Sequence, residues 1–95
     1  MAKRSKKHDI GLLEQELVKA SKAGFIDSIL PIAANSSYCG FHVYFKASMP
    51  SSKINQVIDY VKNTHEISAY FDPRQNYCQF YILKKNAKNK GGSKL

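Results

Sequence analysis

Several residue types on which small proteins often depend are scarce in this chain of 95 residues. It holds no tryptophan, two cysteines, three prolines and three histidines. His8, His42 and His65 stand far apart, and no Cys-x-x-Cys or His-x-x-x-His spacing occurs. Metal sites in proteins use ligands at short, regular spacings. The sequence therefore gives no reason to expect a metal ion, and no motif in it calls for a cofactor.

Long apolar runs are also missing. No stretch approaches the roughly 18–20 apolar residues of a membrane-spanning helix, and the first residues lack the apolar segment of a secretory signal. We therefore expect a soluble cytoplasmic protein without a membrane partner. Cys39 and Cys78 fall on apolar positions of the chain. In the cytoplasm such cysteines stay reduced, although a bridge between neighbouring strands is the alternative.

Carboxylates are absent from both ends of the chain. Residues 1–8 and 84–95 together carry nine Lys or Arg, whereas residues 9–83 carry six Lys or Arg against seven Asp or Glu. The formal charge of +8 thus belongs to the ends. We expect a basic arm (1–8), a single domain (9–83) and a basic tail (84–95). Such arms neutralise phosphates by counterion release; the alternative is that they only aid solubility.

The pattern of apolar residues predicts two helices and four strands. The first helix has Asp9 as N-cap and Gly24 as its stop, and Pro31 confines the segment after it to an edge strand. The second helix opens at Pro50 and carries an apolar stripe from Ile54 to Val61. The expected elements are a helix at 9–24, a strand within 25–33, a strand at 38–48, a helix from 50, and strands at 67–72 and 77–85. This α-β-β-α-β-β order predicts an α+β two-layer sandwich, with a mainly antiparallel sheet and both helices on one face.

The aromatic residues of the expected strands are sorted by parity. Phenylalanines share one parity with the cysteines and aliphatic residues, and the tyrosines occupy the other. Successive strand side chains point to opposite faces, so one face is apolar and the other is rich in tyrosine and partly basic. Tyrosine also favours half-exposed strand positions for purely structural reasons, because cross-strand aromatic pairs stabilise a sheet.

Catalytic constellations are hard to find. Asp27 and Asp72 are isolated, Asp9 and Glu66 fit the ends of elements, and no glycine-rich phosphate loop is present. A nucleophile with its base, or a pair of carboxylates, needs a defined arrangement that these residues do not suggest. We therefore expect that the protein is not an enzyme.

Exposed rings on a sheet can stack on unpaired bases while cationic arms hold the phosphates. We expect Tyr44 and Tyr81 to be the main stacking residues. The full set of expected nucleic-acid contacts on the domain is Tyr38, His42, Tyr44, Lys46, Tyr70, Arg74, Tyr77, Tyr81 and Lys85. The expected contacts on the arms are Lys3, Arg4, Lys6, Lys7, Lys84, Lys88 and Lys90. The alternative is a protein-binding module on the same face: a homodimer, or a small inhibitor of viral, phage or plasmid type.

One local resemblance favours RNA over DNA. The segment Met49-Pro50-Ser51-Ser52-Lys53-Ile54, followed by Ile58 and Val61, is similar to the second helix of the bacterial small-subunit ribosomal protein eight family, an RNA binder. That family's C-terminal RNA-binding half has no counterpart in this chain. The resemblance implies RNA as the partner. Together with the exposed rings it leads us to expect single-stranded or structured RNA, with DNA as the second choice.

Overall fold

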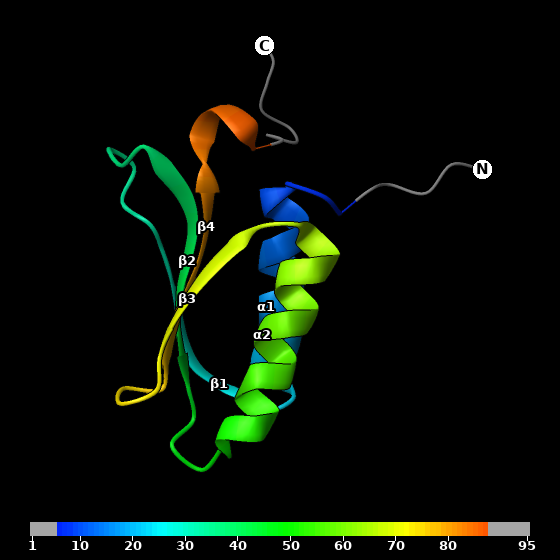
Figure 1. The fold of residues 1–95 in the computed structure, drawn as a ribbon, viewed down its shortest axis with the longest axis vertical. Coiled ribbons are helices and arrows are strands. Elements are labelled where there is room, and N and C mark those ends of the chain that lie inside the picture. The colour runs from blue at the N-terminus through cyan, green and yellow to red at the C-terminus, as the bar shows by residue number, and fades with distance from the viewer. Residues whose placement is uncertain (1–5, 88–95) are drawn as a thin grey trace, which may run out of the picture.

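The structure is a computed structural model that describes residues 6–87. In these residues two helices and four strands follow one another in the order α-β-β-α-β-β (Figure 1). The elements are α1 (Ile10–Lys22), β1 (Ile26–Pro31), β2 (Tyr38–Phe45), α2 (Ser51–His65), β3 (Ser68–Asp72), β4 (Tyr77–Leu83) and the short 3₁₀ helix η1 (Lys84–Asn86). The predicted α+β fold and its element order are confirmed.

The four strands form one antiparallel sheet in the order β1-β2-β4-β3. Two hairpins, β1–β2 and β3–β4, are joined through the central pair β2–β4, and α2 connects them along the chain. β1 is an edge strand, as Pro31 predicts, and its register shifts between Ile26 and Ser28. A proline and a bulge both weaken pairing, which fits an edge position.

The first helix begins and ends where its sequence predicts. The side chain of Asp9 accepts a hydrogen bond from the backbone N–H of Leu12 (3.1 Å), which satisfies one of the unpaired donors of the first turn. At the other end Gly24 adopts a φ of 93°. Its N–H donates to Ser21 and that of Phe25 donates to Ala20, the hydrogen-bond pattern of a Schellman motif.

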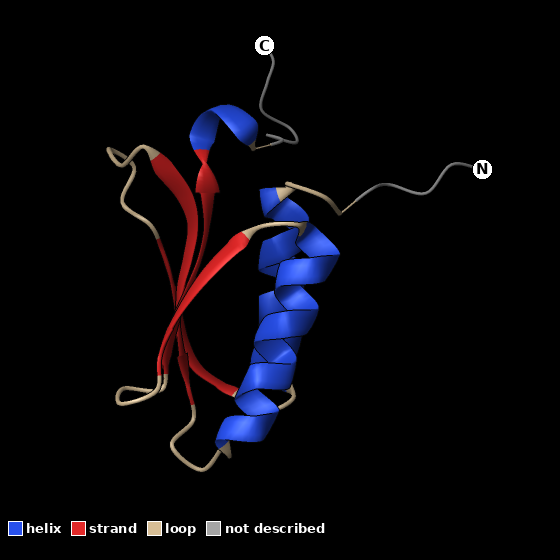
Figure 2. Cartoon of the chain, in the orientation of Figure 1, coloured by secondary structure: helices blue, strands red, loops and turns tan. Residues whose placement is uncertain are grey.

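The core lies between the sheet and the two helices, which cover the same face (Figure 2). Leu13 and Leu17 project from α1, and Ile54, Ile58 and Val61 from α2. Their partners on the sheet are the inward residues of β1, β2 and β4: Ile26, Phe41, Val43, Phe45, Cys78, Phe80 and Ile82. One apolar face of the sheet and one stripe of each helix are thereby buried, while the opposite face of the sheet has no layer over it within residues 6–87.

Both cysteines are free. Cys39 pairs with Ile82 and Cys78 pairs with Val43, so the two lie four positions apart along neighbouring strands. At about 3.3 Å per residue this separation is far beyond the reach of a disulfide, roughly 7 Å between Cα atoms. Burial raises the pKa of Cys78 to about 12, so its thiol stays neutral.

Two strands end earlier than their sequence suggests. β2 ends at Phe45, because the Met49 N–H donates to Lys46 in a turn (3.0 Å) that leads into α2. β4 ends at Leu83, where the chain turns into η1 and the Lys84 N–H donates to Ser37 (2.9 Å). The expectation that Lys46 and Lys85 belong to strands was therefore wrong. Because both lysines lie beyond the strand ends, they do not contribute positive charge to the open face itself.

Candidate nucleic-acid interface on the open sheet face

The register of the four strands places the outward side chains in rows that run across the sheet. The first complete row is Leu30, His42, Gln79 and Tyr70, from β1 to β3. The next is Ser28, Tyr44, Tyr77 and Asp72. On the other side of the first row Tyr81 pairs with Gly40 on β2 and with Ser68 on β3, and beyond it Tyr38 pairs with Leu83. We call these residues the tyrosine face.

The tyrosines of this face differ in how much of each ring is free. Tyr70 is 56% exposed and Tyr38 is 41% exposed, whereas Tyr44, Tyr77 and Tyr81 are half-buried. Tyr44 packs against Tyr77 with ring centroids 5.0 Å apart. Tyr44 therefore spends part of its surface on its neighbour, and it lies one residue from the end of β2. The two most exposed rings of this face are Tyr38 and Tyr70, whereas the sequence predicts Tyr44 and Tyr81 as the main stacking residues.

A glycine makes room for the contact between Tyr38 and Tyr81. Their rings meet edge to face, with centroids 5.4 Å apart, beside Gly40, the direct partner of Tyr81. Gly40 has a φ of 145°, and a Cβ atom there would overlap the carbonyl oxygen of Phe80. Any other residue would be strained and would push β4 away. Gly40 thus allows the two backbones to approach closely.

Three polar side chains are linked at the centre of the face. The hydroxyl of Tyr77 lies 2.6 Å from Nδ1 of His42 and donates to Oε1 of Gln79 at 3.3 Å. The rings of His42 and Tyr77 also stack, with centroids 5.9 Å apart. Burial raises the pKa of Tyr77, with further contributions from Tyr44, Cys78 and Tyr70, so its hydroxyl stays protonated at neutral pH. These bonds hold His42 and Gln79 in fixed orientations.

Positively charged side chains lie at the two ends of the tyrosine face and not on its strands. None of its strand positions between residues 28 and 83 carries Lys or Arg. Lys46 follows β2, and Arg74 lies in the β3–β4 turn at the same end, since Tyr44 and Asp72 both pair with Tyr77. Lys84 and Lys85 follow β4 at the opposite end. The face is therefore an aromatic surface without Lys or Arg, with one carboxylate, that of Asp72, and with cations at both ends, in place of the partly basic face expected.

Two of these four cations have contacts within the domain. The Lys84 ammonium donates to the carbonyl of Ala34, and Nε of Arg74 lies 4.0 Å from Asp72. The Arg74 side chain is still 92% exposed, and a pair of this kind contributes little in water. Arg74 and Lys85 are thus available to a ligand, while Lys84 has to give up one hydrogen bond.

The basic N-terminal residues lie on the helix side. Nζ of Lys6 is 3.2 Å from Glu16 of α1, and Nζ of Lys7 is 3.3 Å from Glu66 at the end of α2. The structure does not bring Lys6 and Lys7 to the tyrosine face. Four other expected contacts lie outside the described residues: Lys3, Arg4, Lys88 and Lys90. Three residues expected in the arms make backbone hydrogen bonds with the domain: Lys6 with Asp9, His8 with His65 and Lys84 with Ser37.

Three residues that matter here were missed or undervalued in the sequence. Leu30 is 52% exposed on the tyrosine face beside His42, a position that depends on the β1 register shift. Gln79 lies between His42 and Tyr70 in its row, and the Tyr77 hydroxyl donates a hydrogen bond to its side chain. His65 is fully buried, four positions beyond Val61 on the apolar stripe of α2. The helical spacing alone could have shown the last of these.

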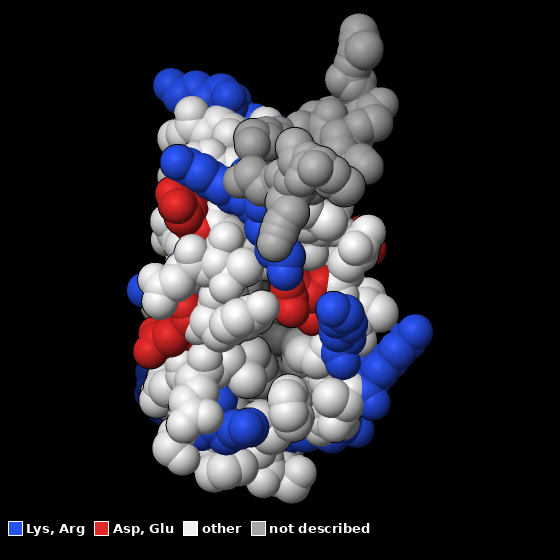
Figure 3. All heavy atoms as spheres, turned by 90° about the vertical axis from the view of Figure 1, so that its right-hand side faces the viewer, with Lys and Arg blue, Asp and Glu red and all other residues white. Residues whose placement is uncertain are grey.

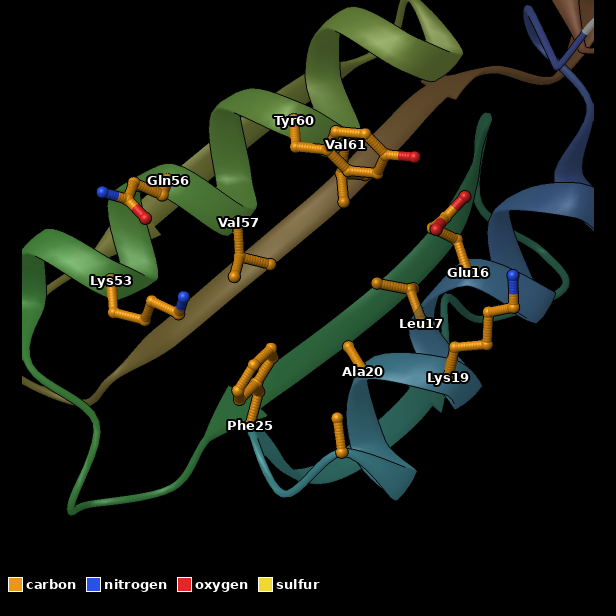
Figure 4. Close-up of a pocket in the computed structure, with 11 residues that line it drawn as sticks. Glu16, Leu17, Lys19, Ala20, Phe25, Lys53, Gln56, Val57, Tyr60 and Val61 are labelled. Atoms are coloured by element: carbon orange, nitrogen blue, oxygen red, sulfur yellow. The ribbon is translucent and has the colours of Figure 1, made fainter.

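The helix face carries a separate feature, a groove of about 380 Å³ between α1 and α2. Its walls are largely apolar, with Leu17, Ala20, Phe25 and Val57 among them, and Glu16 and Tyr60 close one end (Figure 4). Nζ of Lys53 lies 5.4 Å from the centroid of the Phe25 ring. The helix side of the molecule carries both acidic and basic side chains (Figure 3).

The fold and the site together define a small α+β sandwich with one covered and one open sheet face. Comparisons with protein-family models, with curated proteins and with solved structures found no match. Within residues 6–87 no helix is long and apolar enough to cross a membrane. The same residues hold no group of three or more His, Cys, Asp or Glu that could bind a metal ion.

Proposed function

We propose that this protein binds single-stranded nucleic acid on its tyrosine face, with RNA preferred over DNA, and does so without catalysing a reaction. The observation that carries the proposal is the exposure of Tyr38 and Tyr70 on an aromatic sheet face whose ends carry Lys46, Arg74 and Lys85. Unpaired bases stack on aromatic side chains, typically with about 1–3 kcal/mol per base. The two free cysteines fit the cytoplasm, where such a partner is found.

The exposed rings, together with the cations at the ends of the sheet, favour an unpaired nucleic-acid strand over a duplex. The flat faces of bases are accessible in a single strand, and in a duplex they are covered by stacking. Tyr38 and Tyr70 offer ring surface, and the cations at the two ends of β2 and β4 are available to the phosphates of a nucleic-acid strand that runs along these β-strands. The basic residues of the arms, Lys3, Arg4, Lys88 and Lys90, add attraction that depends on salt.

A second candidate, protein docking on the same face, is favoured by a specific observation. The face carries no Lys or Arg on its strands, and Leu30 is 52% exposed there. Depletion of charge and enrichment of tyrosine are typical of the centres of protein interfaces. A second copy of this chain would bury these residues as well as a heterologous partner would. Sedimentation equilibrium separates this candidate from the first, because a homodimer forms without nucleic acid.

Fluorescence anisotropy with labelled single-stranded RNA and DNA tests the proposal, with Tyr70→Leu compared to Tyr60→Leu. Tyr60 is 51% exposed on α2, so the two variants remove equally accessible rings from opposite sides of the molecule. We expect Tyr70→Leu to weaken binding about 5- to 100-fold and Tyr60→Leu to leave it within twofold. Equal effects of the two variants, or no binding to either nucleic acid at low salt, would contradict the proposal.

The contribution of the arms is tested separately. A variant with Gln in place of Lys3, Arg4, Lys88 and Lys90 keeps the chain length and removes four positive charges. If these residues contact phosphates, the slope of log Kd against log salt becomes shallower by roughly 3, at about 0.7 per phosphate on a single strand. An unchanged slope would restrict the phosphate contacts to Lys46, Arg74, Lys84 and Lys85.

A further inference from the structure

We infer that His42, Gln79 and Tyr70 form a site that reads the edge of one unpaired base, an inference that rests on the proposed function. These residues belong to the row that β2, β4 and β3 contribute across the sheet. Among the complete rows of the tyrosine face, this row combines two polar side chains at its centre with an exposed ring at its end. Stacking and edge recognition therefore become available side by side.

The hydrogen bonds of Tyr77 determine what the site can offer. Tyr77 has one hydroxyl proton and stands between Nδ1 of His42 (2.6 Å) and the amide of Gln79 (3.3 Å). When the hydroxyl donates to Gln79 Oε1, His42 Nδ1 donates to Tyr77, which leaves His42 Nε2 as an acceptor and the Gln79 amide N–H₂ as a donor. If the chain of bonds runs the other way, with the amide turned, Nε2 donates and the amide oxygen accepts. Either direction leaves one donor and one acceptor.

Both groups are accessible to a ligand. Among residues 6–87, His65 Nε2 is the one side-chain nitrogen or oxygen atom that is buried without a hydrogen-bond partner. His42 Nε2 and the Gln79 amide nitrogen therefore do not belong to the buried, unpaired atoms, and both residues are partly exposed, so these atoms reach solvent. A donor beside an acceptor is the pattern that the Watson–Crick edge of every base displays. Phosphate, by contrast, presents acceptors and is commonly bound by Lys and Arg, neither of which occurs in this row.

Tyr70 completes the site. Its ring is 56% exposed and makes no ring contact within the described part of the chain, although its direct cross-strand neighbour is Gln79. Directly opposed side chains on a sheet lie about 5 Å apart at Cβ. A base stacked on Tyr70 therefore places its edge within reach of Gln79, and the neighbouring His42 side chain lies on the far side of Gln79 in the same row.

The test measures base preference with labelled homo-oligonucleotides of U, A and C, about eight nucleotides long. We expect the full-length protein to prefer one of the three, and Gln79→Met to remove that preference by weakening the best oligonucleotide about 5- to 100-fold. Tyr70→Leu should weaken all three. The matched control is Gln56→Met, the same exchange in α2 on the opposite side of the molecule, which should change nothing. Gln79→Thr, which suits a strand, repeats the test if Gln79→Met fails to fold.

The outcomes separate this inference from the proposed function. Equal affinity for U, A and C, or a preference that survives Gln79→Met and Gln79→Thr, overturns the base-reading site but leaves single-strand binding intact. If Gln79→Met changed the affinity for each oligonucleotide no more than the control Gln56→Met does, the base-reading site would also be overturned. No binding to any oligonucleotide at low salt overturns both the proposed function and the site that rests on it.

Discussion

The two faces of the sheet are made by the same strands and have opposite properties. Phe80 is fully buried under the helices, whereas its neighbour Tyr81 points to the tyrosine face and is half-buried. Cys78 and Gln79 show the same contrast, one a neutral buried thiol and the other a solvent-accessible amide. The comparison teaches that a two-residue period gives one strand a buried apolar face, which stabilises the fold, and a second face that remains open to solvent.

The largest expected effect removes a side chain from the covered face. Phe80→Ala should lower the free energy of unfolding by about 3–5 kcal/mol, because it leaves a cavity beneath both helices. Urea denaturation measures the loss, with Tyr81→Ala as the comparison from the neighbouring position. If the two substitutions cost the same, stability does not reside mainly on the covered face.

Gly40 tests the close approach of β2 and β4 that supports both faces. Gly40→Ala should destabilise by about 2–3 kcal/mol, since its φ of 145° disfavours a side chain and the new Cβ would overlap the Phe80 carbonyl. Gly24→Ala is the matched control, because its φ of 93° is also positive but nothing lies within 4 Å of a Cβ there. It should cost about 1 kcal/mol. Equal losses in thermal and urea unfolding would show that the contact with β4 is unimportant.

Alkaline pH should weaken the covered face through Cys78. Its pKa is raised to about 12 by burial, above the ordinary value near 8.5, so the neutral thiol stabilises the fold below about pH 8.5. This stability is lost progressively as the pH rises toward 12, by roughly 1–2 kcal/mol at pH 10. Urea denaturation at pH 7 and pH 10 measures the loss, which Cys78→Val should reduce. An unchanged alkaline loss in Cys78→Val would assign it to other groups, such as Tyr77.

The smallest expected effect on stability comes from the tyrosine face. Tyr70→Leu and Tyr60→Leu should each change the free energy of unfolding by no more than about 0.5 kcal/mol, because both rings are largely in solvent. A Tyr70→Leu variant that loses nucleic-acid affinity without losing stability would separate binding from folding. A loss above about 1 kcal/mol in Tyr70→Leu would mean that this ring has a structural role.

The sequence predicts the architecture well because local signals agree with one another. Asp9 and Gly24 delimit α1, Pro31 restricts β1 to the edge, and the alternation of phenylalanine and tyrosine assigns the two faces. These features depend on neighbours within a few residues. The predicted order of elements and the placement of both helices on one face are accordingly found in the structure.

The details of the candidate site depend on contacts between distant segments, which single-sequence patterns do not contain. The ends of β2 and β4 are determined by turns near Lys46 and Lys84, so the expected lysines leave the face. The ion pair of Lys7 with Glu66, at the end of α2, joins residues far apart in the chain. The relative exposure of Tyr70 and Tyr44 likewise follows from which neighbour each ring meets across the strands.

The most direct test of the central claim is an NMR titration of ¹⁵N-labelled full-length protein with a single-stranded RNA oligonucleotide. The account predicts shift changes concentrated at outward residues of the sheet, including Tyr38, Tyr70 and Gln79, and at Lys46, Arg74 and Lys85 on its ends. Amides of α1 and α2 that line the helix groove should move little. Changes centred on α1 and α2, or none at a large excess of RNA, would contradict it.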